Sequence, residues 1–474
     1  MNHPATPTIE SLPATLARQR AAFLRDGPPT LAERKTHLAW LKAAILARQA
    51  DIERALRADF GHRSPHETAI LEVMPLIQGI DYQRRHLRKW MRPERRQVPV
   101  HFQPARAWVS YQPLGVIGIM APWNYPVGLA LMPLATALAA GNRAMIKPSE
   151  FTPAASALLV ELIEETFSSE QVVVVTGDAT VGQAFSALPF DHLVFTGSTP
   201  VGRAVMKAAS ENLVPVTLEL GGKSPVIVDR GHLLQHAAAS IAFGKLANAG
   251  QTCIAPDYVM LHEDEVQGFV DAFDQAVRSL YPDGPASDQY SSIIDERHHA
   301  RLTGLLDDAR AKGATVREVG ANAGTAGRRA HTLAPTVVLS VTDAMRILKE
   351  EIFGPVLPVI AYRDLDEAIA YVNARPRPLA LYYFGSNSEH QRKVLALTTS
   401  GNVTINNTLL HYAQEDLPFG GVGPSGIGAY HGVEGFKALS HAKGIFEQGR
   451  WNLSGLLRPP FGPLANMIVK FMMR

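Results

Sequence analysis

The sequence contains a single cysteine, Cys253, in the run Gly250-Gln251-Thr252-Cys253, and Glu219 lies upstream of it in Leu218-Glu219-Leu220-Gly221-Gly222-Lys223. A thiol and a carboxylate are the residue types of a nucleophile and its general base. An isolated cysteine is more often a small buried apolar residue, so that interpretation is weighed first. The residues just before Cys253 are small and polar, whereas a core thiol more often sits in an apolar run. The local sequence therefore favours a reactive thiol.

Asn124 lies between two prolines, in Pro122-Trp123-Asn124-Tyr125-Pro126. An amide N–H₂ group held in a rigid loop can donate a hydrogen bond to a developing oxyanion. An asparagine in a turn is more often a local hydrogen-bonding residue, so this segment alone leaves both roles open.

Two segments have the pattern of a dinucleotide site. Phe195-Thr196-Gly197-Ser198-Thr199-Pro200-Val201-Gly202 joins a predicted strand to a predicted helix, where backbone N–H groups can bind phosphate. Its glycines are spaced G-x-x-x-x-G and not G-x-G-x-x-G, so a tight structural turn explains them equally well. Lys147 and Glu150 follow another strand, where they could hold ribose hydroxyl groups or form an exposed pair.

The chain has 474 residues, more than one hydrophobic core usually serves, so we expect two or three domains. The formal net charge of +2 gives no reason to expect a nucleic acid or an acidic surface as a partner.

The single cysteine excludes an intrachain disulfide and a cysteine-based zinc cluster, so we expect no metal site. A chain without disulfides also fits a reducing compartment, so the expected location is the cytoplasm. Residues 1–7 lack the charged and apolar regions of a secretory signal.

The C-terminal segments 456–461 and 464–474 are apolar but are broken by prolines and charges. They are too short to span a bilayer, so we expect no transmembrane anchor. The second segment could form a small amphipathic helix, either as a packing element or as a weak membrane contact.

Helical and strand patterns place these residues in an α/β chain. Residues 30–60 predict a helix that begins with a capping box of Thr30 and Glu33, and most of the first ninety residues read as helical. Residues 92–99 are a charged break, and 101–111 predict a strand or hairpin arm.

After this arm, short apolar runs alternate with helical segments, which predicts parallel βαβ units. The predicted strands are residues 116–120, 144–146, 172–175, 192–195 and 216–218, then 226–228, 258–261, 336–339, 356–360 and 380–384, with a helix at 364–373 and a glycine-rich loop at 418–428.

Taken together, these motifs resemble the aldehyde dehydrogenase superfamily. Glu350-Glu351-Ile352-Phe353-Gly354-Pro355 and Pro418-Phe419-Gly420-Gly421 also match, so the motifs run in order from Pro122 to Gly421. Within the superfamily, the run from Gln251 to Tyr258, the short N-terminal lead and the tail at 458–461 look like the class 3 branch. That branch handles medium-chain, fatty and aromatic aldehydes, and the bacterial coniferyl aldehyde dehydrogenases are similar. Pro424 stands where many members have a basic residue, which bears on substrate shape more than on chemistry.

The resemblance implies a role for each matching residue. Cys253 would attack the aldehyde carbon, Asn124 and the Cys253 backbone N–H would hold the oxyanion, and Glu219 would activate the water that hydrolyses the thioacyl-enzyme. Glu351 could share the base role. The residues implied to bind the cofactor are Lys147, Glu150, Thr196, Gly197, Ser198, Gly202, Glu351 and Phe353, and those implied for the aldehyde tunnel are Tyr125, His411 and Tyr412. The carboxylate of Glu150 disfavours a 2′-phosphate, so the expected cofactor is NAD, with NADP possible.

The implied fold class is α/β and aldehyde dehydrogenase-like. It has a Rossmann-type cofactor domain with a parallel sheet of about five strands, an α/β catalytic domain and a small β oligomerisation element. We assign residues 1–92 and 113–220 to the NAD-binding domain, 221–400 to the catalytic domain, 93–112 and 401–450 to the oligomerisation element, and 451–474 to a C-terminal tail. The resemblance implies a homodimer whose arms pair across subunits and whose substrate is a small-molecule aldehyde.

Two other functions stay open. A CoA-acylating dehydrogenase would pass the acyl group to a thiol, but such relatives commonly lack a base at the position of Glu219. A non-catalytic binding protein on the same fold would not need Asn124, Glu219, Cys253 and Glu351 together.

Overall fold

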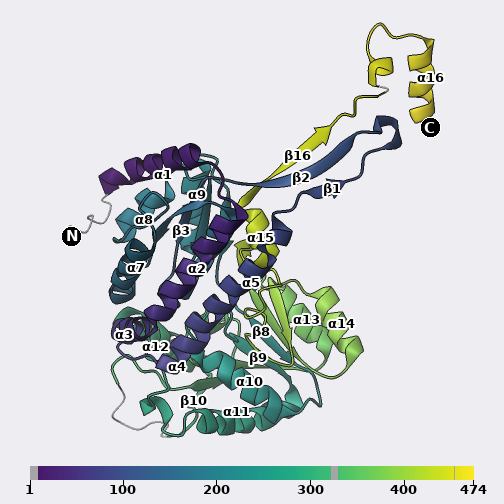
Figure 1. Cartoon of the computed structure of the whole chain (residues 1–474). Coiled ribbons are helices and arrows are strands. Elements are labelled where there is room, and N and C mark those ends of the chain that lie inside the picture. Colours follow the sequence, from purple (N-terminus) through teal and green to yellow (C-terminus); the bar gives the residue numbers. More distant parts are fainter. Residues whose placement is uncertain (1–8, 322–328, 453, 474) are drawn as a thin grey trace.

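The computed structural model describes residues 9–321, 329–452 and 454–473. Two α/β bodies lie against each other, and a β-stranded arm extends from them to a small helical tail (Figure 1). The α/β fold class expected from the sequence is confirmed. The predicted N-terminal lead, residues 1–7, lies outside the described residues.

The first ninety residues are mostly helical, as predicted. The predicted helix over 30–60 is two helices, because the backbone departs from helical geometry at Arg48, where φ is −107°. The capping box of Thr30 and Glu33 forms at the start of the first one. The helices are α1 (Leu12–Asp26), α2 (Leu31–Ala47), α3 (Gln49–Asp59), α4 (Pro65–Thr68) and α5 (Met74–Trp90), with a π-helical turn at Ala69–Val73 between the last two.

The first body is built on a six-stranded sheet of order β15-β7-β6-β3-β4-β5. Five of its strands are parallel and coincide with the predicted strands of the first region. They are β3 (Val116–Met120), β4 (Arg143–Lys147), β5 (Val172–Val174), β6 (His192–Thr196) and β7 (Val216–Glu219), and the short β15 (Gly426–Ile427) adds antiparallel to β7.

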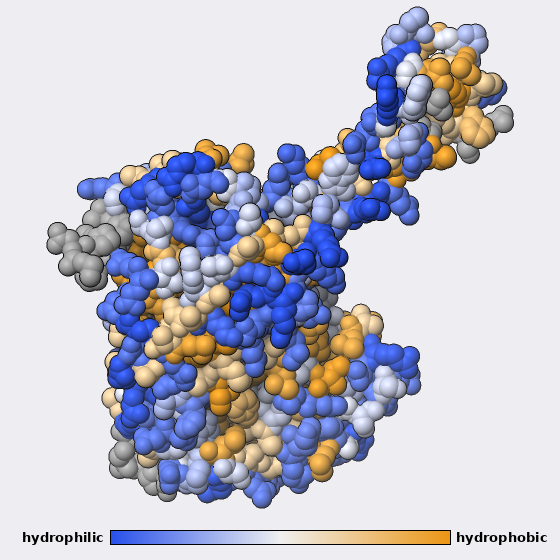
Figure 2. Space-filling model, in the orientation of Figure 1, coloured by the Kyte–Doolittle hydropathy of each residue, from blue (hydrophilic) through white to orange (hydrophobic). Residues whose placement is uncertain are grey.

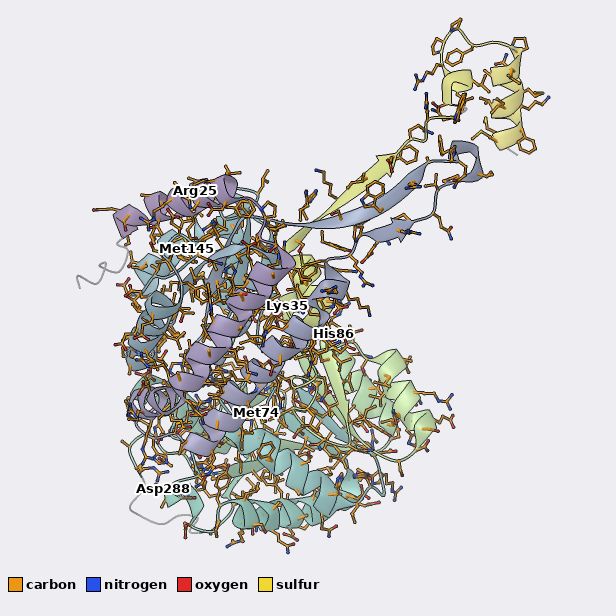
Figure 3. All side chains as sticks on the ribbon, viewed as in Figure 1. Arg25, Lys35, Met74, His86, Met145 and Asp288 are labelled. Carbon is orange, nitrogen blue, oxygen red and sulfur yellow. The ribbon has the colours of Figure 1, made fainter. Side chains whose placement is uncertain are left out.

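Helices cover both faces of this sheet. Because side chains alternate along a strand, Ile117 and Ile146 face α6 (Gly128–Ala140) and α7 (Pro153–Thr166). Met145 and Phe195 face the opposite side, where α1, α8 (Ala179–Ser186) and α9 (Thr199–Ser210) pack. Met145 is labelled in Figure 3. The strands are therefore buried on both faces, which explains their continuous apolar sequences.

Helix α6 is buried along its whole length. Arg34 of α2 caps its C-terminal end, because the guanidinium donates to the carbonyl oxygens of Ala139 at 3.1 Å and Ala140 at 2.7 Å. A cation at this end also interacts favourably with the helix dipole. Gly141 follows with a left-handed φ of 92°, and a side chain there would strike the guanidinium of Arg34.

The second body is built on a seven-stranded sheet of order β10-β11-β12-β9-β8-β13-β14. Its inner strands agree with the predicted ones. They are β8 (Pro225–Val228), β9 (Tyr258–His262), β11 (Thr336–Leu339), β12 (Val356–Tyr362) and β13 (Ala380–Phe384), and the helices are α10 (Leu234–Leu246), α11 (Val266–Leu280), α12 (Glu296–Ala311), α13 (Leu365–Asn373) and α14 (Ser388–Leu397). The edge strands β10 (Thr315–Glu318) and β14 (Asn402–Ile405) are not among the predicted strands, since both are short and half polar.

Residues after 401 contribute to all three sheets of the structure. β14 pairs with β13 in the second sheet, β15 pairs with β7 in the first, and β16 (Ser440–Glu447) pairs with β2 (Arg106–Pro113) in the arm. The short helix α15 (Gly432–Ala438) lies between the last two strands. The stretch 401–450, which the sequence assigned to one oligomerisation element, is thus divided between the bodies and the arm.

The arm is a three-stranded antiparallel sheet of order β1-β2-β16, with β1 at Glu94–Arg96. The strand predicted at 101–111 starts later, because Val100–Phe102 form a 3-10 turn. Helix α16 (Pro463–Met472) lies at the far end of the arm (Figure 1). Hydrophobic residues lie on the surface of this tail (Figure 2), and Phe461 and Phe471 are among its exposed residues, at 66% and 81%. Among the residues described, no helix is long and apolar enough to cross a membrane.

Candidate active site

The first sheet has a topological switch point at β3. β4 and β5 lie on one side of β3, and β6 and β7 lie on the other. Ligands of open parallel sheets bind in the crevice beyond the carboxyl ends of the strands at such a point. Lys147 ends β4, Thr196 ends β6, and the turn of Asn124 follows β3. The structure therefore gathers three predicted motifs at one edge of the sheet.

The segment predicted to bind phosphate begins a twelve-residue helix at this edge. Ser198 precedes α9, and its side chain makes no capping hydrogen bond, which leaves the first N–H groups of the helix for an anionic ligand. A side chain at Gly202 would come within 2.5 Å of Leu220, so glycine allows α9 to approach the sheet closely. Gly197 is similarly confined, because its added carbon would lie 2.6 Å from the ring of Phe195.

Lys147 and Glu150 are the second part of the predicted dinucleotide site. Lys147 is only 4% exposed, and its ammonium nitrogen lies 3.1 Å from Oε2 of Glu150. An exposed charge pair, the alternative that the sequence left open, would not bury the lysine. A buried cation and an exposed carboxylate at a strand end can bind adjacent ribose hydroxyl groups. These residues therefore fit the nicotinamide dinucleotide that the motifs imply.

The chain reaches Cys253 through a run of left-handed residues. Helix α10 ends at Leu246, and Asn248, Ala249 and Gly250 have φ values of 52°, 52° and 77°. Positive φ is costly for residues other than glycine, so the surrounding structure must hold this turn. A side chain at Gly250 would collide with the carbonyl oxygen of Gly354, so the loop passes directly beside the Phe353 segment.

Asn124 lies against the loop of Cys253. Its side-chain nitrogen donates to the carbonyl oxygen of Gln251 at 3.0 Å, and the hydroxyl of Tyr125 lies 2.6 Å from Oγ1 of Thr252. Asn124 is 3% exposed. These bonds connect the first body to the second, so Asn124 is not the local turn residue that the sequence left as an alternative.

Two carboxylates, buried Glu219 and half-buried Glu351, act electrostatically on Cys253. Glu219 ends β7, and neither of its oxygens has a hydrogen-bond partner within the described residues. Burial raises the pKa of Glu219 well above its usual value, and burial raises the pKa of Glu351 to about 8. Burial first, and then the charges of Glu351 and Glu219, raise the pKa of Cys253 to about 12. The three groups form one coupled site in which the thiol is protonated at neutral pH.

Several residues that the sequence analysis did not assign to the site hold the Glu351 segment. Asp257 pairs with Lys223, and it accepts the N–H of Ile352 at 2.9 Å. Arg301 donates to the carbonyl oxygens of Glu351 at 3.2 Å and Ile352 at 2.5 Å. Asp257 and Lys223 each stand next to a predicted strand, and charges beside strand ends are the sequence signal that could have identified them.

Phe353 and Lys245 complete this side of the site. The ring of Phe353 meets the ring of Trp123 edge-on, with 5.4 Å between centroids. Lys245 of α10 is buried near Asp257 and Glu351, and burial lowers its pKa to about 8. The sequence signal for this residue is a lysine in the otherwise apolar last turns of α10, residues 241–246.

A buried aromatic cluster, here defined as Tyr412, Phe419, Tyr430 and His431, also lies near Cys253. His431 stacks on Phe419 at 5.1 Å and lies 4.6 Å from Tyr430, measured between ring centroids. Burial, with a smaller contribution from the charge of Cys253, raises the pKa values of Tyr412 and Tyr430.

Polar atoms in and beside the aromatic cluster lack partners. Both ring nitrogens of His431 and Oε2 of the neighbouring Glu415 are buried without a hydrogen bond in the part of the chain that is described. Such atoms call for a ligand or an ordered water. His411, predicted for the tunnel, stacks on Phe419 with 6.0 Å between ring centroids. Its Nδ1 lies 2.7 Å from Oγ1 of Thr404, and its Nε2 is buried without a partner among the described residues.

The raised pKa of Cys253 predicts slow alkylation. Without cofactor, iodoacetamide should react with Cys253 more slowly at pH 8 than with a free cysteine, because the thiolate is the reactive form. Glu351→Gln removes a negative charge, lowers the pKa of the thiol and should speed alkylation, which mass spectrometry can follow. Exposed Glu296→Gln is the matched control. If Cys253 of the parent protein reacts as fast as free cysteine, its pKa is not raised. If iodoacetamide stops NADH production while Cys253 stays unmodified, the loss of activity does not come from this thiol.

Comparison with known proteins agrees with the geometry. Residues 10–445 match the aldehyde dehydrogenase family. The chain is 51% identical over 461 residues to a probable coniferyl aldehyde dehydrogenase of Pseudomonas aeruginosa, and the matched region covers 97% of this chain and 96% of that protein. It is 35% identical to a dimeric NADP-preferring aldehyde dehydrogenase of Canis lupus familiaris, with 92% and 94% covered. The structure of Staphylococcus aureus AldH in its substrate-bound state matches with a TM-score of 0.92 at 37% identity and covers 97% of this chain and 99% of that one. As its motifs predicted, the chain belongs to the aldehyde dehydrogenase family.

Proposed function

We propose that Cys253, Asn124 and Glu219 carry out the NAD(P)-dependent aldehyde oxidation of this family member, and that its substrates are aromatic aldehydes of the coniferyl type. The observation that carries the proposal is the hydrogen bond from Asn124 to the loop of Cys253. It places an amide donor, a thiol and an unpaired buried carboxylate within one electrostatic site.

The first stage is addition of the thiol to the aldehyde. The S–H bond of Cys253 breaks as its proton passes to water, the sulfur bonds to the carbonyl carbon, and the carbonyl π electrons move to oxygen, which gives a thiohemiacetal oxyanion. The backbone N–H of Cys253 and the side chain of Asn124 donate to that oxygen. A primary amide has two N–H donors, so Asn124 can keep its bond to Gln251 and still use the other.

The second stage returns the acid. When bound, the nicotinamide dinucleotide accepts a hydride from the former aldehyde carbon, which leaves a thioester on Cys253. Glu219 takes a proton from water, the resulting hydroxide attacks the thioester, and the carboxylic acid leaves as Cys253 is released. The buried position of Glu219 supports this role, because burial raises the pKa of its carboxyl group above the usual value and so makes the carboxylate a stronger base.

The cofactor would lie at the switch point of the first sheet. Lys147 and Glu150 would hold the adenosine ribose, Thr196, Gly197, Ser198 and Gly202 would form the phosphate turn, and Glu351 and Phe353 would lie at the nicotinamide end. The exposed carboxylate of Glu150 supports a preference for NAD over NADP, by repulsion of a 2′-phosphate. The single cysteine is the support for a cytoplasmic location.

The aromatic cluster supports the substrate class. Planar rings stack well on Phe419 and Tyr412, and the unpaired nitrogens of His431 could bind a phenolic hydroxyl. The name of the Pseudomonas aeruginosa relative points to the same class, since coniferyl aldehyde is a phenolic cinnamaldehyde.

Removal of the base should separate the two stages. Glu219→Gln should keep a first-turnover burst of NADH but lose steady turnover by roughly 100-fold or more, because only hydrolysis needs the base. Stopped-flow absorbance measures both phases, and Glu351→Gln, assayed in parallel, reports whether that residue shares the role. Undiminished steady turnover would contradict the assignment of Glu219. Recovery of turnover on addition of CoA would instead indicate a CoA-acylating enzyme.

Substitution in the aromatic cluster should change substrate preference. His431→Phe keeps the ring but removes both nitrogens, so kcat/KM for coniferyl aldehyde should fall by roughly tenfold or more. Cinnamaldehyde has no phenolic hydroxyl, and its kcat/KM should change much less. Steady-state assays on the two aldehydes give the ratio, and an equal loss on both would contradict a contact between His431 and the phenol.

We also propose a homodimer held by the arm. The arm exposes Val100 and Phe446, at 85% and 53%, far from the bodies of its own chain (Figure 1). The name of the canine relative supports this assembly. Sedimentation equilibrium should give about twice the chain mass of 51.5 kDa. Phe446→Glu should shift the protein towards monomers, whereas Leu24→Glu, on the exposed surface of α1, should not; a monomeric parent protein would contradict the proposal.

A further inference from the structure

Two fully buried charges of the N-terminal helical region pair with each other. Nη1 of Arg63 lies 3.1 Å from Oε1 of Glu72, and neither side chain has any exposed area. Arg63 precedes α4, and Glu72 lies in the π-helical turn that follows it. Removing two charges from water is costly, so a buried ion pair seldom adds net stability. Its presence therefore calls for an explanation other than stability.

Both members of this ion pair bind the turn of Asn124. Nη1 of Arg63 donates to the backbone oxygen of Asn124 at 3.0 Å. Oε2 of Glu72 accepts the backbone N–H groups of Val127 at 3.0 Å and Gly128 at 2.8 Å, at the start of α6. The guanidinium of Arg63 also lies 5.0 Å from the ring centroid of Tyr125. The turn is thus held before and after its bend by side chains from one short segment.

Glu67, from the same segment, binds the loop of Cys253. Its Oε1 accepts the backbone N–H of Asn248 at 3.0 Å, and its Oε2 accepts the hydroxyl of Ser291 at 2.5 Å. Asn248 is one of the left-handed residues that precede Cys253. A fixed partner for its N–H helps to hold a conformation that a non-glycine residue rarely adopts.

The turn and the loop meet at the backbone oxygen of Asn124. That oxygen accepts from Arg63 at 3.0 Å and from Nδ2 of Asn248 at 3.0 Å. The side chain of Asn124 donates in the other direction, to Gln251. The turn belongs to the first sheet and the loop to the second body, and within the described residues no strand pairing joins those two sheets. Side chains must therefore set the distance between the amide and the thiol.

We infer that Arg63, Glu67 and Glu72 are positioning residues, which hold the amide of Asn124 in register with Cys253 for the oxyanion step. The inference rests on the roles proposed above for Asn124 and Cys253. The three residues act through the backbone of the turn and the loop and need not touch the substrate.

The test removes the ion pair without leaving a buried charge. The double variant Arg63→Met/Glu72→Leu replaces both charges by apolar groups, so no unpaired charge stays buried and the protein should fold. Its unfolding temperature should be lower than that of the parent, because the N–H groups of Val127 and Gly128 lose their acceptor. Its kcat for aldehyde oxidation should fall by roughly 100-fold, because a small displacement of the amide weakens oxyanion stabilisation. Its KM for NAD should change by less than about twofold, because the cofactor residues lie on other segments. If this variant does not fold, Arg63→Lys keeps the charge but loses the planar fork, and kcat should fall by roughly tenfold.

A double-mutant cycle distinguishes positioning from a general structural effect. Asn124→Ala should itself lower kcat by roughly 100-fold. If the ion pair acts through Asn124, adding Arg63→Met/Glu72→Leu to Asn124→Ala should lower kcat by less than about threefold more. A structural role would make the two losses multiply.

Arg34→Met is the matched control. Arg34 is also a buried arginine that binds α6, but at the opposite end of that helix. Its replacement should lower the unfolding temperature and leave kcat of the folded enzyme within about twofold.

The outcomes separate this inference from the proposed mechanism. If Asn124→Ala keeps full activity, the proposed oxyanion role fails, and the positioning role fails with it. If Asn124→Ala is impaired while Arg63→Met/Glu72→Leu is fully active, or while the two losses multiply, only the positioning inference is overturned.

Discussion

The active site depends on one long-range hydrogen bond, from the side chain of Asn124 to the backbone oxygen of Gln251. The two residues stand on different α/β bodies, so side-chain contacts between the Asn124 turn and the Cys253 loop set the distance between the amide donor and the thiol. At Gly250 the loop passes so close to the carbonyl oxygen of Gly354 that there is no room for a side chain. Rigid loops of this kind keep catalytic groups in the geometry that a reaction needs, at a cost in backbone strain.

Two carboxylates, Glu219 and Glu351, set the electrostatics of the site. Glu219 has no hydrogen bond among the residues that the structure describes, and an unpaired buried carboxylate costs free energy unless it takes up a proton. Glu351 and Glu219 together oppose ionisation of Cys253. The site thus keeps the thiol of Cys253 protonated, and a cationic group brought beside the thiol would shift the balance towards the thiolate.

The elements that the sequence predicted well are those buried on both faces. β3 and β6 read as continuous apolar runs because helices cover both sides of their sheet. The strands it did not predict, β1, β10, β14, β15 and β16, are short or lie at sheet edges, and they become strands only because a neighbour is in place to pair with them. This is also why the stretch 401–450 reads as one element although its strands join three sheets.

The sequence by itself determined the family and the chemical groups, because a thiol, an amide and two carboxylates occur in ordered motifs from Pro122 to Gly421. It also predicted that Lys147 and the turn before α9 follow strands, since apolar runs mark strand ends locally. Only the tertiary structure decided that Asn124 crosses to the Cys253 loop and that Arg63 pairs with Glu72. The same holds for the unpaired state of Glu219. Hydrogen bonds between distant segments and the loss of solvent around a charge depend on neighbours brought together by folding, and local sequence does not encode those neighbours.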